Sequence, residues 1–166
     1  MSVEVPRQQW ASLIESGRVH GSLYCDPEIF KIELEKIWYR AWVYVGHTSE
    51  IPNRNDFVTK SIGPMPVLMV RDREGEVRLL LNRCPHRGNA VCVVEKGNRA
   101  SFTCPYHSWT FANDGRLMGY AFPDGYEGVE KSTLGLSAVP RIAIYKGFVF
   151  GSMATDGPTL EEHLGG

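Results

Sequence analysis

The sequence predicts a mostly β protein, an antiparallel β domain preceded by N-terminal helices. From residue 42 onward, short runs of β-branched and aromatic residues follow one another at close intervals. Before residue 42, apolar residues recur at helical spacing instead. Clusters of Gly, Pro, Asn and Asp separate the β-like runs, as hairpin turns do, at residues 63–66, 72–75, 96–98 and 113–115.

Two helices are expected in the N-terminal segment. The first is predicted from Pro6 to Ser16, where Trp10 and Leu13 share one face and a glycine follows. The second is predicted from Pro27 to about residue 42, because Asp26 suits the N-cap and proline suits the first helical position. Residues 1–41 are therefore expected to form a helical segment of their own.

The β region is expected to contain a strand in each apolar run. A long surface loop is predicted at residues 123–136, and the tail from residue 158 is expected to start a helix. The predicted strands lie at residues 42–45, 57–62, 67–70, 77–81, 91–94, 100–103, 109–112 and 116–120, with the last hairpin within 141–150.

Composition limits the classes of function. The chain has 166 residues, 43% hydrophobic and 22% charged, which suits one globular domain with a small appendage. Its net charge of -1 and its lack of dense Lys or Arg runs argue against a nucleic-acid partner. No apolar run is long enough to span a bilayer, and the N-terminus lacks a signal-peptide pattern. We therefore expect a soluble, cytoplasmic protein without a membrane partner.

Four cysteines are few for a disulfide scaffold, and two of them lie next to histidines. Cys84 and His86 lie in one short loop, and Cys104 and His107 lie in another, each directly after a predicted strand. The spacing is C-x-H, seventeen residues, then C-x-x-H. Each cysteine precedes a proline, which favours an extended, turn-forming backbone. Each loop thus offers one thiolate and one imidazole to a metal.

This ligand set indicates a [2Fe–2S] cluster of the Rieske type. In such a centre two thiolates bind one iron and two imidazoles bind the other, so each loop would give its Cys to one iron and its His to the other. A neutral imidazole in place of a thiolate makes the cluster less negative and easier to reduce. Potentials rise from about −400 mV to between roughly −150 and +300 mV.

Two other interpretations of these residues remain open. A structural zinc site also uses Cys and His, but such sites usually pair like ligands, whereas each loop here mixes them. The four residues could also be core cysteines and surface histidines without a metal. Two Cys-Pro loops with a histidine at offsets two and three would then be coincidental. Ligand type and spacing favour the cluster.

Longer segments resemble the Rieske domain of bacterial aromatic-ring-hydroxylating oxygenase α subunits. The resemblance extends over about residues 22–166. It implies a Rieske-type antiparallel β-sandwich over residues 42–157, with a two-loop cluster-binding subdomain at about 82–122. The segments that carry it are Ile37–Trp42, Val45–Pro52, Asn82–Gly88, Phe102–Phe111, Asn113–Leu117 and Tyr145–Gly151.

Respiratory Rieske proteins resemble this pattern less closely. They carry an extra cysteine in each loop, forming a disulfide that braces the cluster, where this chain has Asn89 and Tyr106. They also place a serine two residues after the second histidine, where this chain has Trp109, which we expect to shield the cluster from water. Fewer donors to the cluster sulfurs predict a potential near the low end of the Rieske range.

The resemblance implies an electron relay within an oxygenase. Such α subunits receive electrons from a ferredoxin or flavin reductase. They pass them to a mononuclear Fe(II) in a C-terminal catalytic domain of the same or a neighbouring subunit of a trimer, for O₂-dependent hydroxylation of an aromatic substrate. Residues 158–166 are expected to begin the linker to that domain, which this chain lacks. No catalytic residue is assigned, because His20, His47 and His163 show no ligand pattern.

A stand-alone Rieske ferredoxin, a small electron carrier, is the competing interpretation. Rieske ferredoxins resemble the β portion alone and are not expected to begin with the helix from Pro27 or the Trp-rich segment after it. These features favour the oxygenase domain. The substrate is not readable from this segment, because the substrate pocket would lie in the catalytic domain.

Overall fold

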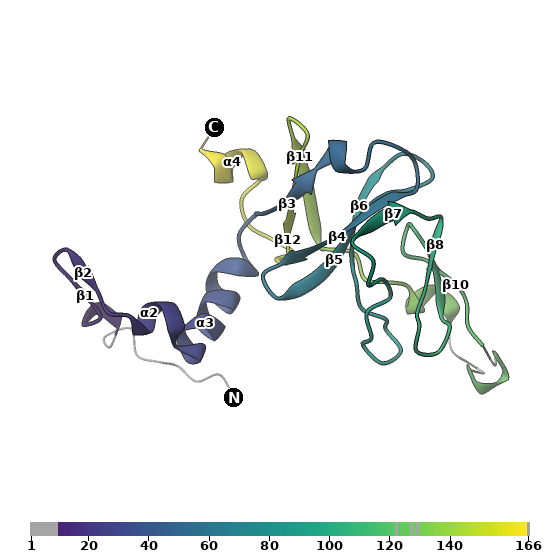
Figure 1. The fold of residues 1–166 in the computed structure, drawn as a ribbon, viewed down its shortest axis with the longest axis horizontal. Helices are drawn as coiled ribbons and strands as arrows, with labels where there is room; N and C mark the ends of the chain where they lie inside the picture. The colour runs from purple at the N-terminus through teal and green to yellow at the C-terminus, as the bar shows by residue number, and fades with distance from the viewer. Residues whose placement is uncertain (1–9, 122, 127, 129, 166) are drawn as a thin grey trace. The chain divides into compact units, whose positions relative to one another are not determined.

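A computed structural model describes residues 10–121, 123–126, 128 and 130–165 (Figure 1). Its contacts divide the chain into two compact units, with the boundary between Ile37 and Trp38. The elements that precede or reach this boundary are β1 (Ile14–Glu15), β2 (Arg18–Val19), α2 (Ser22–Cys25), α3 (Pro27–Glu33) and a π-helix, η1 (Leu34–Trp38).

The first predicted helix is wrong from Ile14 onward, although Trp10 and Ala11 are helical. Ile14 pairs with Val19 in the two-stranded hairpin β1–β2, and Gly17 in its turn has a φ of 73°. Glycine takes this left-handed conformation without steric cost, so Ser16-Gly17 favours a reversal here over a helix end. Residues 6–9 of the predicted helix lie outside the described residues.

The second helix begins as predicted. The Asp26 side chain accepts a hydrogen bond from the Glu28 amide at 2.9 Å, and Pro27 is the first helical residue. The α-helical pattern ends at Glu33, earlier than expected, and a π-helical turn continues the segment to Trp38. Capping chemistry therefore predicted the start of this helix better than apolar spacing predicted its end.

The second unit is mostly β, as predicted, and its strands form three antiparallel sheets. Their orders are β6-β5-β4-β7, β10-β9-β8 and β11-β12-β3. Short helices η2 (Thr48–Glu50), η3 (Pro123–Tyr126), η4 (Lys131–Leu134) and α4 (Leu160–Leu164) accompany them. The strands are β3 (Val43–His47), β4 (Asp56–Ile62), β5 (Met65–Arg71), β6 (Val77–Leu81), β7 (Lys96–Asn98), β8 (Ser101–Thr103), β9 (Thr110–Ala112), β10 (Leu117–Gly119), β11 (Arg141–Tyr145) and β12 (Phe148–Ser152).

The four-stranded sheet contributes to two apolar cores through its two faces. Along β5, Leu68 and Val70 belong to one core, whereas Val67 and Met69 belong to the other, and all four are fully buried. This alternation follows from the two-residue period of a strand. The first core also contains residues of β8–β10 and both predicted ligand cysteines, and the second contains residues of β3 and β12. The central sheet is therefore the frame for everything around it.

One predicted strand, residues 91–94, is wrong. These residues are not in a strand, and β7 instead forms at Lys96–Asn98, where a turn was predicted. The side chain of Asn82 accepts hydrogen bonds from the amides of Val91 and Cys92, both at 3.0 Å. Val91 and Cys92 are buried and apolar like strand residues, but the Asn82 side chain, rather than a neighbouring strand, accepts the hydrogen bonds of their amides.

Among the described residues, no helix is long and apolar enough to cross a membrane.

The turn between β5 and β6 holds a buried carboxylate. Asp72 is fully buried and accepts hydrogen bonds from the Glu76 amide and the Arg78 guanidinium, both at 2.8 Å. Burial raises the pKa of Asp72, but these hydrogen bonds and the Arg78 charge together hold it below the ordinary 3.8. The ionised form is therefore the one that stabilises the fold.

Replacing Asp72 with Asn should lower the free energy of unfolding at neutral pH by about 1–3 kcal/mol, because a charged hydrogen-bond acceptor is lost from a buried site. Since the folded-state pKa is depressed, the contribution of Asp72 is complete above 3.8 and is lost as the pH falls through the lower folded-state pKa. Urea unfolding at a series of pH values should therefore show a weaker acid dependence in the variant.

The matched control is Glu74→Gln, which breaks an ion pair with Arg73 in the same turn, where both side chains are more than half exposed. This change should lower the free energy of unfolding by less than about 0.5 kcal/mol. Equal losses in the two variants, or an unchanged acid dependence in Asp72→Asn, would contradict the assignment.

Candidate metal centre

Both predicted ligand loops leave strands that contribute to the first core. β6 ends at Leu81 and leads into the loop with Cys84 and His86, while Cys104 and His107 lie in the turn between β8 and β9. Figure 1 shows the long connection after β6 and the β8–β9–β10 sheet extending from the same side of the four-stranded sheet. The fold therefore brings together two loops that the sequence separates by seventeen residues.

The first loop is closed by its own backbone. The Cys84 amide donates to the Asn89 carbonyl, and the Gly88 amide donates to the Cys84 carbonyl, both at 2.8 Å. Gly88 has a φ of 74°. A Cβ at this position would lie only 3.1 Å from Nε of Arg83. Both the conformation and the limited space beside Arg83 therefore favour glycine here.

The second loop repeats this design. The Cys104 amide donates to the Trp109 carbonyl at 2.8 Å, and the Ser108 amide donates to the Cys104 carbonyl at 3.0 Å. Ser108 occupies the position equivalent to Gly88 and has a φ of 58°, an uncommon conformation for a residue with a Cβ. Two loops of unlike sequence therefore hold their cysteines in matching backbone turns.

The two thiols are buried and close to each other. Cys84 and Cys104 are each 2% exposed, and both are free. Burial raises the pKa of the Cys84 thiol, hydrogen bonding from the His86 amide lowers it, and the neighbouring Cys104 thiol raises it, with a net increase. The Arg87 amide also reaches the Cys84 sulfur. Backbone amides are thus directed at a sulfur that would carry negative charge in a metal complex.

The two imidazoles lie side by side. Their ring centroids are 4.6 Å apart, and Nδ1 of His86 is buried without a hydrogen-bond partner. Burial, followed by the charges of His86 and Arg87, lowers the pKa of His107 and favours its neutral form. An unpartnered buried nitrogen is costly unless something binds it, and a neutral imidazole is the form that ligates metals.

Aromatic side chains enclose the pair of imidazoles. Trp109 is 3% exposed and stacks on His86 with a centroid distance of 5.0 Å and an interplanar angle of 2°. The Tyr106 ring lies 3.8 Å from that of His107, and Tyr126 packs against Trp109 at 5.4 Å. The position of Trp109 agrees with the predicted shielding of this site.

The donor set fits a [2Fe–2S] cluster. Two buried thiols, one buried unpartnered nitrogen and a second imidazole come from two opposed loops, as two thiolate and two imidazole ligands require. Within the described residues, no three His, Cys, Asp or Glu side chains are grouped to hold a single metal ion. A two-iron cluster needs only two protein ligands on each iron, so it does not need such a group.

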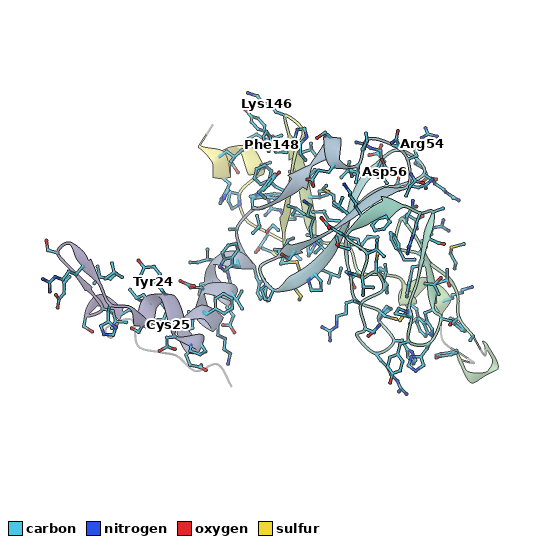
Figure 2. The ribbon with its side chains drawn as sticks, in the orientation of Figure 1. Tyr24, Cys25, Arg54, Asp56, Lys146 and Phe148 are labelled. Atoms are coloured by element: carbon cyan, nitrogen blue, oxygen red, sulfur yellow. The ribbon has the colours of Figure 1, made fainter. Side chains whose placement is uncertain are left out.

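The remaining cysteines and histidines have other environments. Cys25 is exposed on α2 in the N-terminal unit (Figure 2), and Cys92 is buried in the first core. Nδ1 of His20 lies 2.8 Å from the Ser22 hydroxyl, and Nδ1 of His47 lies 2.8 Å from that of Ser49. These two histidines are thus hydrogen-bonded to a nearby serine.

Sequence reasoning did not single out Asn82. This residue is 5% exposed and lies between the end of β6 and Cys84, with its carboxamide hydrogen-bonded across the loop. The available signal was a polar residue directly after a run of three leucines, at a position where burial demands a partner.

Comparison with known proteins agrees with this geometry. The family described as Rieske [2Fe-2S] domain matches residues 41–127. The chain is 45% identical over 150 residues to the large subunit of anthranilate 1,2-dioxygenase from Acinetobacter baylyi, covering 89% of this chain and 32% of that protein. It is 39% identical to the α subunit of biphenyl 2,3-dioxygenase from Rhodococcus jostii, covering 90% and 33%. The chain thus spans about a third of the length of these curated relatives.

Solved structures show the same relationship. Naphthalene 1,2-dioxygenase from Rhodococcus sp., bound to indole, matches with a TM-score of 0.84 and 40% identity, covering 95% of this chain and 36% of that chain. The relatives named here are dioxygenase components rather than stand-alone ferredoxins. The chain therefore belongs to the Rieske [2Fe–2S] domain family, as a Rieske domain of the kind found in ring-hydroxylating dioxygenase α subunits.

Proposed function

We propose that Cys84 and Cys104 bind one iron of a [2Fe–2S] cluster, that His86 and His107 bind the other, and that the domain moves single electrons. The observation that carries this proposal is the convergence of two free buried thiols with the unpartnered buried Nδ1 of His86. The cluster, when bound, supplies a centre that accepts and releases one electron. The cluster-binding subdomain would extend over about residues 82–122.

The chain's own residues would set the properties of that centre. The amides of His86 and Arg87 reach the Cys84 sulfur and would stabilise negative charge there. Trp109 would exclude water from one face of His86. Respiratory Rieske proteins have a bracing disulfide at the positions where this chain has Asn89 and Tyr106. We therefore propose a reduction potential near the low end of the Rieske range.

We further propose that the domain serves an oxygenase that hydroxylates aromatic substrates. Electrons would come from a ferredoxin or flavin reductase and pass to a mononuclear Fe(II) in a catalytic domain of the same or a neighbouring subunit, in a trimer. The names of the anthranilate, biphenyl and naphthalene dioxygenases support the aromatic substrate class. Transfer between subunits is supported by a solved quaternary ammonium Rieske monooxygenase, 30% identical to this chain, whose structure gives insight into inter-subunit electron transfer in that protein.

Purified protein should contain iron and acid-labile sulfide in equal amounts, about two of each per chain when fully loaded. After reduction with dithionite it should give the EPR spectrum of a Rieske [2Fe–2S] centre, with an average g value below that of an all-cysteine cluster. Zinc without iron or sulfide, bound at the same four residues, would overturn the cluster assignment.

Replacing His107 with Cys should lower the reduction potential by roughly 100 mV or more if a cluster still assembles, because a thiolate adds negative charge to the centre. Redox titration followed by visible absorption measures this shift. His163→Cys on α4 is the control and should leave the potential unchanged. If His107→Cys also leaves it unchanged, His107 is not a ligand.

A further inference from the structure

The two ligand loops differ in how their ends are held together. The second loop is closed by β8 and β9, where Thr103 pairs with Thr110 in the ladder and their hydroxyls lie 3.0 Å apart. The first loop leaves β6 at Leu81, but the returning residues 91–94 form no strand. The chain rejoins the four-stranded sheet only near β7, where the Thr59 amide donates to the Glu95 carbonyl at 2.7 Å, so sheet hydrogen bonds close the first loop farther from its ligand residues than they close the second.

Asn82 closes the first loop before the chain reaches β7. Its Oδ1 accepts from the amides of Val91 and Cys92 at 3.0 Å each, and its Nδ2 donates to the Cys92 carbonyl at 2.6 Å. Its own amide donates to the Pro66 carbonyl on β5 at 2.9 Å. The buried side chain of Asn82 thus ties the returning end of the loop to its outgoing end, and the backbone amide of the same residue anchors that outgoing end to the central sheet.

We propose that Asn82 is a positioning residue for the metal centre, which holds Cys84 and His86 against the second loop. It does for residues 91 and 92 what strand pairing does for the second loop, in a chain where Asn89 and Tyr106 stand at the positions of the bracing disulfide. This inference rests on the proposed function, because the centre that Asn82 positions is the proposed cluster.

The burial of these groups makes the closure strong. Asn82, Val91 and Cys92 are each no more than 5% exposed, so water does not replace a lost hydrogen bond without opening the loop. The hydrogen bonds Cys84–Asn89 and Gly88–Cys84 lie inside the segment that Asn82 closes and fix only its local shape. Without Asn82, the loop would keep its turn but lose its fixed position relative to Cys104 and His107.

Two substitutions separate the contacts of Asn82. Asn82→Ala removes all three side-chain hydrogen bonds. Asn82→Asp is nearly isosteric and keeps an acceptor for the two amides, but it places a carboxylate oxygen against the Cys92 carbonyl. Asp should therefore give a smaller effect than Ala in the same direction, and it remains measurable if Ala prevents folding.

Asn113→Ala is the matched control. Asn113 is also a buried asparagine, 1% exposed, and its Nδ2 donates to Asn55 Oδ1 at 2.8 Å. Asn55 lies between Arg54 and Asp56, which Figure 2 labels near the start of β4. Asn113 follows β9 at the end away from Trp109, so its loss should reduce stability without moving the ligand loops.

The first readout needs no cluster. In a Cys25→Ser background, cluster-free protein is treated with a thiol-modifying reagent under native conditions, and mass spectrometry of peptides measures labelling at Cys84. Asn82→Ala should speed this labelling by roughly tenfold to a hundredfold, as the loss of two or three buried hydrogen bonds implies. Asn113→Ala should change it less than about twofold.

The second readout is the EPR spectrum and reduction potential of reconstituted protein. Asn82→Ala and Asn82→Asp should broaden or shift the signal of the reduced cluster and lower the iron retained per chain, whereas Asn113→Ala should not. Equal Cys84 labelling and identical spectra in the Asn82 and Asn113 variants would overturn the positioning role. If unsubstituted protein holds no cluster, the proposed function fails, and the labelling rates still test the loop closure separately.

Discussion

The structure depends on bringing a thiol and an imidazole from each of two short loops into one small volume while keeping the sulfurs away from water. Each loop meets this demand with the same backbone turn, in which the cysteine amide and carbonyl are both hydrogen-bonded within the loop. The two cysteines are then each 2% exposed, and the centroids of the two imidazole rings lie 4.6 Å apart. Loop geometry, rather than residue type alone, makes these four residues a candidate site.

The central sheet allows this arrangement because its two faces have different tasks. One face packs against β3 and β12 and forms an ordinary apolar core. The other packs against β8–β10 and contributes to the same core as Cys84 and Cys104, so the base of the candidate centre is itself part of a core. Trp109 joins this core to the site by stacking on His86. The cost of burying polar ligand atoms is therefore offset by apolar burial around them.

Sequence patterns predicted the parts of this fold that short-range chemistry determines. The bounds of β6 and the start of the helix at Asp26-Pro27 agree with the prediction. The two Cys-Pro loops indicated the candidate ligand set. The segment 91–94 was misassigned because its apolar run resembles that of a strand, while its hydrogen bonds go to Asn82, nine residues or more before it. The hairpin at Ile14 was missed because a single turn with Gly17 overrode helical spacing. Contacts between distant segments carry no local signature.

The central claim is that two histidines, one from each loop, bind a reduced [2Fe–2S] cluster. Pulsed EPR of the reduced protein, grown with ¹⁵N-histidine, measures this directly. We predict hyperfine coupling to two imidazole nitrogens, one of which disappears on replacement of His107. A reduced cluster without strong nitrogen coupling would contradict the ligand assignment, because it would mean that neither His86 nor His107 binds iron.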